Sequence, residues 1–322
     1  MDRKQMITLA VMAALLILPP LFIWTGYAFY LDLATRLVIL AIAAVSLNLL
    51  LGYGGMASFG HAAFIGIGAY AVGIPAYHNT YGEFELVASY NGFFQIFLAV
   101  AITALFALIT GIICLRTKGV YFIMITMAFA QMVFYLFISL EVYGGDDGLV
   151  IDTRSEFPLL NLDNPLHLYF FSFISLAAAM LIVRTIARSQ FGMVLKGAMG
   201  NEERMIALGY NTYAYKLTAY VISGAMCGYA GALLGNFTTF ISPEMMGWTR
   251  SGELMFMVIL GGAGSTIGPV IGSGLFVLVE ELLSSFTIYW HLPFGLMLIL
   301  VVLLFRGGLL GLISGNSKSG GH

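Results

Sequence analysis

The sequence predicts an all-α integral membrane protein of about ten helices, and composition and hydrophobic patterning are the two observations behind this prediction. Hydrophobic residues make up 60% of the 322 residues and charged residues only 9%, whereas a soluble globular domain carries roughly 25% charged residues. Apolar runs near the ~20 residues that cross a bilayer as a helix recur along the chain. They are continuous and do not alternate as barrel strands do. Most of the surface is therefore expected to face lipid.

The apolar runs define the expected helices in order. Charged residues at 2–4 precede the first run and resemble the start of a signal peptide, but no small-residue cleavage site follows, so an uncleaved anchor is expected. The run at 252–262 is too short to cross alone and is expected to be a half-helix or to extend upstream. The runs lie at residues 6–24, 30–51, 57–77, 93–114, 119–140, 166–187, 215–237, 252–262, 266–285 and 290–306.

The distribution of lysine and arginine predicts the orientation. Alternating crossings that start inside leave only Arg36, Arg154 and Arg250 of the 14 Lys and Arg residues on the outer side. Cytoplasmic loops of membrane proteins carry an excess of Lys and Arg, so both termini are expected in the cytoplasm. The inner cations are Arg3, Lys4, Arg116, Lys118, Arg184, Arg188, Lys196, Arg204, Lys216, Arg306 and Lys318.

No linker marks a second domain, so residues 1–313 are expected to form a single transmembrane domain. The Gly/Ser-rich tail 314–322 is expected to be disordered and cytoplasmic. Loop 141–165 is acidic and lies on the outer side, where it is either a solvated connector or a dock for an external partner. Loop 188–214 lies on the inner side and mixes both charges.

Glycine is abundant, with 38 residues, and two Gly-rich interruptions resemble each other. Residues 51–60 and 260–268 each precede a Gly-rich apolar helix. Paired interruptions of this kind indicate a transport pathway built from repeated halves with broken helices; convergent helix packing through glycine is the alternative. The glycines assigned to the pathway or to helix packing are Gly52, Gly55, Gly60, Gly261, Gly262, Gly264 and Gly268.

Few polar side chains fall within the apolar runs. Asn48 is expected to be hydrogen-bonded across a helix interface. Ser58 and His61 are expected to share a helical face, where His61 bonds either a solute or, more commonly for such a histidine, a neighbouring group. Glu280 and Glu281 are expected at the level of the lipid headgroups. The pathway candidates are these glycines together with Asn48, Ser58 and His61.

The inner loop contains the pattern of a short helix. Asn201 can cap it, Glu202 and Glu203 follow in the first turn, where acids favour the helix dipole, and Gly209 can end it. A helix over 202–208 would place Met205 and Leu208 on one face. Such a helix suits docking into a groove of another protein; an amphipathic connector lying on the bilayer is the alternative.

Several motifs are absent from the sequence. It contains no GxxxxGK[ST] phosphate loop and no HExxH, and Met56 before Ser58 breaks the G-x-S-x-G pattern. Cys114 and Cys227 lie in apolar runs and form no metal motif. The chain is therefore not expected to be an enzyme, to hold a metal or to bind a cofactor, and its net charge of −2 gives no signal for nucleic acid.

Five segments match, in order, the branched-chain amino acid permease family of ABC importers, and most closely its longer M-type subunit. The resemblance covers about residues 35–310. At 198–200 the chain reads Ala-Met-Gly, where members often have a basic residue. The matching segments are Leu47–Tyr53, Ser58–Tyr70, Val194–Tyr210, Tyr215–Ala225 and Gly228–Leu233.

The resemblance implies an ABC importer permease fold in a bacterial inner membrane. A second, homologous permease, two cytoplasmic ATPase subunits that use ATP and Mg, and an external solute-binding protein would be the partners. Branched-chain amino acids are the leading solute for transport by alternating access; urea or short amides are the alternative, and a passive channel or an ion-coupled transporter is an alternative of another class. The residues implied in coupling to the ATPase are Asn201, Glu202, Glu203, Arg204, Met205, Ala207, Leu208 and Gly209.

Overall fold

The computed structural model describes residues 3–24, 28–82, 88–158, 160–286, 289, 291–304 and 308–314. The predicted tail beyond 314 and the predicted inner cations Arg306 and Lys318 lie outside these residues. The helices are α1 (Arg3–Trp24), α2 (Ala28–Asn48), α3 (His61–Tyr81), α4 (Gly92–Cys114), α5 (Val120–Ser139), α6 (Pro165–Arg188), α7 (Gln190–Gly200), α8 (Glu202–Ala207), α9 (Thr212–Thr238), α10 (Trp248–Gly261), α11 (Gly268–Phe286), α12 (His291–Leu304) and α13 (Gly308–Ser314).

Helices dominate the described chain, as predicted, and the two strands, β1 (Leu149–Val150) and β2 (Phe240–Ile241), form one short antiparallel pair. Asparagine side chains begin several helices. Asn91 accepts a hydrogen bond from the backbone N–H of Phe93 at the start of α4, and Asn164 accepts one from Leu166 at the start of α6. These caps satisfy backbone donors that have no partner within the helix.

Six helices of the described residues are long and apolar enough to cross a membrane, so the predicted count of about ten is not confirmed. Among the other predicted crossings, α10 and α12 have 14 residues each, about 21 Å of helix against a hydrocarbon core of about 30 Å. The six lie at Phe29–Tyr53, Gly92–Cys114, Val120–Ser139, Pro165–Arg188, Thr212–Thr238 and Gly268–Phe286.

The structure moves the start of one predicted helix, decides between the two options for the short run at 252–262, and adds a helix in one predicted loop. The third helix begins at His61, not at 57, and continues to Tyr81, where Gly82 adopts a left-handed conformation with φ of 73°. The short run at 252–262 extends upstream to Trp248, one of the two options that the sequence left open. Within loop 188–214, the structure forms α7 ahead of the predicted short helix.

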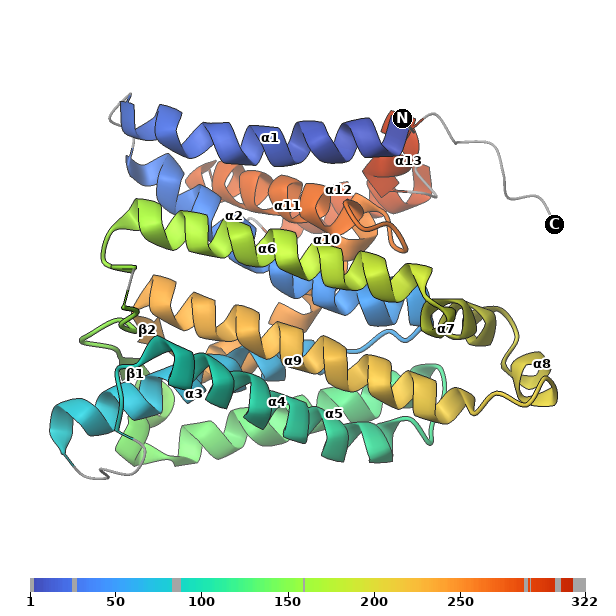
Figure 1. Cartoon of the computed structure of the whole chain (residues 1–322), viewed down its shortest axis with the longest axis horizontal. Coiled ribbons are helices and arrows are strands. Elements are labelled where there is room, and N and C mark those ends of the chain that lie inside the picture. The colour runs from blue at the N-terminus through green and yellow to red at the C-terminus, as the bar shows by residue number, and fades with distance from the viewer. Residues whose placement is uncertain are drawn as a thin grey trace.

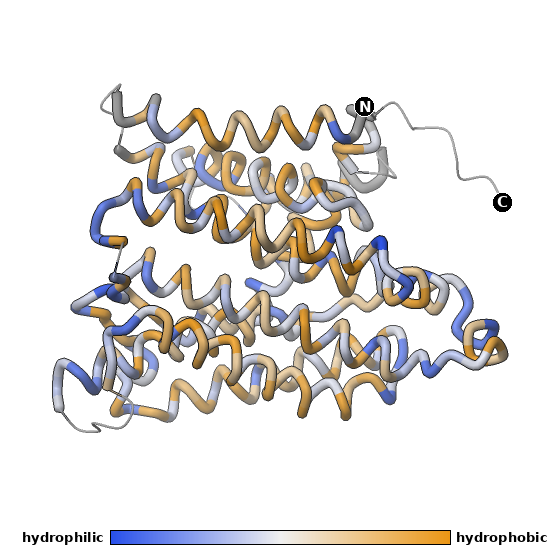
Figure 2. The backbone as a smooth tube through the Cα atoms, in the orientation of Figure 1, coloured by the Kyte–Doolittle hydropathy of each residue, from blue (hydrophilic) through white to orange (hydrophobic). Residues whose placement is uncertain are grey.

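The long helices form a bundle with a common axis, shown in Figure 1. The start of α1, together with α7, α8 and α13, lies at one end of the bundle, and β1 and β2 lie at the opposite end. Loop 188–214 and loop 141–165 therefore project from opposite ends, as the predicted alternation of crossings requires. Apolar residues predominate along the helices, whereas α8 and the loops carry many of the polar ones (Figure 2).

Small residues bring the central helices into backbone contact. A Cβ atom added at Gly68 on α3 would lie 2.0 Å from the carbonyl oxygen of Gly228 on α9. One added at Gly231 would lie 2.0 Å from the carbonyl oxygen of Ile65. Close approach through small residues is how helices associate in a bilayer, where burial of apolar surface gives no driving force between them. Glycine is therefore required at these two crossings of α3 and α9.

Candidate functional site

The two Gly-rich interruptions predicted from the sequence lie in direct contact. The first is a π-helical turn at Leu49–Tyr53, which continues α2, followed by a non-helical stretch before α3. The second is the turn between α10 and α11, residues 262–267. The hydroxyl groups of Tyr53 and Thr266 lie 3.4 Å apart across this contact. Two breaks that are distant in sequence therefore meet within the bundle.

Asn48 holds the two interruptions together. Its side chain is fully buried; its amide nitrogen donates to the carbonyl oxygen of Ser265 at 2.8 Å, and its oxygen accepts from the N–H of Gly264 at 2.9 Å. The expected hydrogen bonding of Asn48 across a helix interface is confirmed. These bonds satisfy backbone groups that the turn leaves without helical partners.

Glycine permits this contact. A Cβ at Gly52 would lie 2.3 Å from the Gly264 nitrogen and 2.2 Å from the Asn48 oxygen. Gly264 itself has φ of 78°, which L side chains rarely adopt. A Cβ at Gly261 would lie 1.8 Å from the carbonyl oxygen of Gly268, so α10 and α11 leave the turn in backbone contact. Gly262 has φ of 106°.

The start of α3 forms a second buried polar cluster. His61 Nε2 lies 2.8 Å from Ser223 Oγ on α9, and Ser223 donates to the carbonyl oxygen of Ser46 on α2 at 2.6 Å. Because the Ser223 hydroxyl has one proton and gives it to the carbonyl, the histidine must donate through Nε2. His61 Nδ1 is then an acceptor, and it has no hydrogen-bond partner among the described residues.

Ser58 does not share a helical face with His61, because α3 begins only at His61. Ser58 lies in the preceding turn and accepts from the N–H of Gly60 at 3.2 Å. Gly60 packs against the backbone of Thr126, whose carbonyl oxygen would lie 2.8 Å from an added Cβ. Gly55 has φ of 66° and contacts Met199 on α7. The predicted residues thus occupy one continuous break, but with different local roles.

The predicted short helix is present as α8, one residue shorter than expected. Asn201 caps it by accepting from the N–H of Arg204 at 2.9 Å. Gly209 follows with φ of 89°, where a side chain would be strained. The sequence pattern of cap, acids and terminal glycine therefore predicted this element closely.

Glu202 joins α8 to two other parts of the chain. Its carboxylate lies 2.7 Å from Lys118 Nζ, just before α5, and 2.7 Å from Lys216 Nζ on α9, and it accepts from the Thr212 hydroxyl at 3.1 Å. Burial opposes ionisation of Glu202, but the hydrogen bonds from Lys118 and Lys216 outweigh it and lower its pKa to about 2. Glu203 and Arg204 are exposed.

The exposed apolar surface of α8 differs from the predicted one. Met205 turns toward α7, where its sulfur would lie 2.7 Å from a Cβ at Gly197. Ile206 and Leu208 instead face outward, 56% and 65% exposed. Helix α8 is too short for the i, i+3 rule to place Leu208, since Leu208 lies beyond its last residue. The exposed apolar pair is therefore Ile206 on α8 and Leu208 directly after it.

Like the two ion pairs of Glu202, two further ion pairs were not predicted from the sequence. Arg36 on α2 lies 2.8 Å from Glu280 on α11, and Arg250 lies 2.9 Å from Glu253 within α10. The Glu280 side chain is only 13% exposed and is paired, while its predicted level among the lipid headgroups stays a prediction. Arg36, a cation within a predicted apolar run, was the signal for the first pair, and the i, i+3 spacing of Arg250 and Glu253 was the signal for the second. No three His, Cys, Asp or Glu of the described residues are grouped as metal ligands.

Apolar helices, with two interrupted segments in contact near the end of the bundle where α7 and α13 lie, define a multi-pass membrane protein of the transport class. The family model described as the branched-chain amino acid transport system permease component matches residues 29–305, and the chain belongs to this family.

Three relatives show how far the likeness extends. The high-affinity branched-chain amino acid transport system permease protein LivM of Escherichia coli K12 is 27% identical over 95% of this chain and 75% of its own length. LivM of Salmonella typhimurium is 26% identical over 87% of this chain and 69% of its own length. The permease protein LivH of Salmonella typhimurium is 32% identical over 45% of this chain and 46% of LivH. No solved structure matches the chain significantly.

Proposed function

We propose that this chain is the LivM-like membrane subunit of an ATP-driven importer of branched-chain amino acids. The observation that carries the proposal is the match to the permease family over residues 29–305, together with relatives that are named for this transport. The likeness to both LivM and LivH supports a homologous second permease as its partner. ATPase subunits and an external binding protein complete the proposed importer.

The proposed coupling runs from α8 into the bundle. An ATPase would contact the exposed Ile206 and Leu208, and Glu202 would pass movement of α8 to α9 through Lys216. On α9, Ser223 contacts both the start of α3 and the end of α2. Movement of α8 can therefore reach the helices that carry the broken segments through direct contacts.

Beyond Ser223, the route ends at the interrupted segments. Asn48, two residues after Ser46 on α2, bonds the turn between α10 and α11. Breaks that can rearrange beside a buried pathway are a recurrent device of alternating access. We assign the change between outward-open and inward-open states to this region.

Uptake by reconstituted vesicles tests the function. The vesicles contain this chain, its second permease and the ATPases, and receive binding protein with labelled leucine or labelled urea, with and without ATP. ATP-dependent leucine accumulation is the expected result. Accumulation of urea in place of leucine would change the solute, and downhill flux without ATP through this chain alone would indicate a channel.

A further inference from the structure

One cavity lies beside the broken-helix contact, between α1, α6 and the turn that joins α10 to α11. Its volume is about 560 Å³, within the ~300–1,000 Å³ of small-molecule sites. Further along the same helix pair, the Tyr169 hydroxyl on α6 donates to the carbonyl oxygen of Leu15 on α1 at 2.6 Å. The cavity lies between that contact and the end of the bundle where α7 begins.

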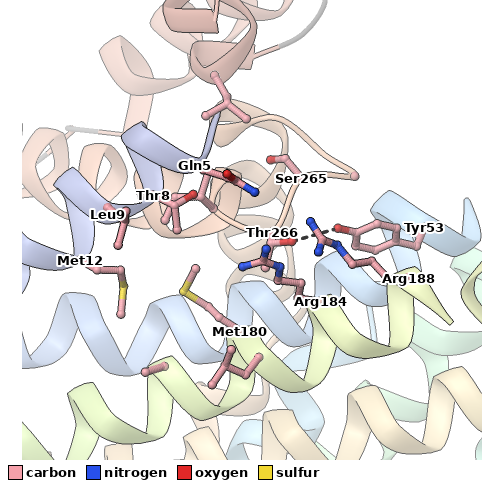
Figure 3. Close-up of a pocket in the computed structure, with 15 residues that line it drawn as sticks. Gln5, Thr8, Leu9, Met12, Tyr53, Met180, Arg184, Arg188, Ser265 and Thr266 are labelled. Atoms are coloured by element: carbon pink, nitrogen blue, oxygen red, sulfur yellow. Dashed lines mark hydrogen bonds between the residues drawn. The ribbon is translucent and has the colours of Figure 1, made fainter. Parts of the chain in front are cut away.

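Two arginines make the cavity positive. Arg184 and Arg188 lie one turn apart on α6, and both point into the cavity toward Thr266 (Figure 3). Arg184 is half-buried, and within the described chain neither guanidinium forms an ion pair. No Asp or Glu is among the residues that line the cavity. Two adjacent guanidinium groups present paired donors that suit the oxygens of a phosphate group.

The other end of the cavity is apolar. Met12 on α1 and Met180 on α6 face each other across it (Figure 3), and Leu9 and Leu181 continue the apolar wall. Leu9 is 59% exposed and Leu181 61% exposed on helices whose outer surface is apolar. The cavity therefore passes from a charged part to a part that is continuous with the lipid-facing surface.

We propose that this cavity binds an anionic phospholipid, with the phosphate on Arg184 and Arg188 and an acyl chain along Met12 and Met180. Basic pockets between transmembrane helices bind anionic headgroups in this way. A zwitterionic amino acid fits less well, because no carboxylate lines the cavity to hold its ammonium group. A free anion would bind only at the arginines and would leave the apolar end of the cavity unoccupied. The lipid would contact the Ser265–Thr266 turn and so lie beside the broken segments.

Native mass spectrometry of the purified permease pair in detergent tests the proposal. The added probes are dioleoyl phosphatidylglycerol, dioleoyl phosphatidylcholine and inorganic phosphate. Retention of phosphatidylglycerol over phosphatidylcholine is the expected result. Arg184→Gln and Arg188→Gln should each weaken phosphatidylglycerol binding about fivefold, whereas Arg184→Lys should keep most of it. Arg116→Gln is the matched control, because it removes an exposed cation from the loop between α4 and α5, outside the cavity.

Three results would overturn the proposal. One is equal retention of both lipids. Another is equal loss of phosphatidylglycerol in Arg116→Gln and in the two cavity variants, which would show a general surface attraction. The third is displacement of the lipid by millimolar phosphate alone, which would show a site for a soluble anion. If Arg184→Gln does not fold, Arg188→Gln and Arg184→Lys still separate these results, because Arg188 is exposed.

Discussion

Glu202 joins α8 to three side chains outside this helix. Lys118, Thr212 and Lys216 all bond its carboxylate, and its pKa falls from the ordinary 4.5 to about 2. A carboxyl group with a lowered folded-state pKa stabilises the fold above its unfolded pKa and loses that contribution as pH falls through the folded value. The attachment of α8 should therefore be constant above about pH 4.5 and weaken between pH 4.5 and pH 2.

Replacement of Glu202 tests this attachment. Glu202→Gln should reduce ATP-driven uptake by roughly two- to thirtyfold, the range for residues along a coupling route, because Lys118 and Lys216 lose their charged partner. Protection of α8 from hydrogen exchange, relative to the intrinsic rate at each pH, should fall, and its loss between pH 4.5 and pH 2 should disappear. Glu203→Gln, on the exposed neighbour, is the control. Identical uptake and exchange in the two variants would contradict the role of Glu202.

Asn48 is the second residue with a specific test. Asn48→Leu keeps the side-chain volume similar but removes the two hydrogen bonds from a buried side chain to the partly buried turn at Gly264 and Ser265. A typical hydrogen bond contributes about 0.5–1.5 kcal/mol, so thermal unfolding in detergent should shift downward. Asn161→Ala in loop 141–165 removes an exposed hydrogen bond to the Asp163 N–H and should shift the unfolding temperature little. Equal shifts would mean that Asn48 does not hold the breaks together.

At the scale of elements, the contact between the two broken segments depends on glycine. Gly52→Ala would place a Cβ 2.3 Å from the Gly264 backbone nitrogen, which must then move. We expect low yield of folded protein and at least ~1–3 kcal/mol of destabilisation. Gly200→Ala on α7, where an added Cβ meets nothing within 4 Å, should be tolerated. Unfolding temperatures from both variants in the same detergent make the comparison, and a stable Gly52→Ala chain would refute the contact.

Some elements could be predicted from sequence and others could not, for physical reasons. The cap at Asn201 and the left-handed Gly209 made α8 predictable, because both signals are local. Helix α7 was missed, since its 11 residues are too few for a crossing signal. The prediction that Ser58 and His61 share a helical face was wrong, because the turn that holds Ser58 is set by contacts with residues distant in the sequence. The similarity of the two Gly-rich segments predicted where both breaks lie, but only the structure shows that Asn48 links them.

At the scale of the whole molecule, composition predicted the all-α membrane class. Composition and apolar runs alone did not give the number of crossings. Short helices such as α10 and α12 do not reach across a bilayer by themselves. Ion pairs such as Arg36 with Glu280 join helices that are 244 residues apart in sequence, and no local pattern encodes that pairing. The charge pattern did place loops 188–214 and 141–165 at opposite ends.

Cysteine labelling tests the predicted orientation of the whole chain. Cys114 and Cys227 are buried, so an unmodified chain should label weakly. On intact cells, a membrane-impermeant maleimide should label Val142→Cys in the outer loop and should reach Leu208→Cys after α8 only when the membrane is permeabilised. Both positions are exposed, at 59% and 65%. Labelling of Leu208→Cys on intact cells would reverse the orientation.

Coupling of leucine uptake to ATP through α8 is tested most directly by Ile206→Ser combined with Leu208→Ser in the reconstituted importer. The measurement records leucine accumulation, ATP hydrolysis and co-purification of the ATPases with the permease pair. Val120→Ser, an exposed apolar residue at the start of α5, is the control. We predict that the α8 variant loses ATP-dependent accumulation and ATPase binding while the control keeps both. Full accumulation and ATPase binding in the α8 variant would contradict coupling through this helix.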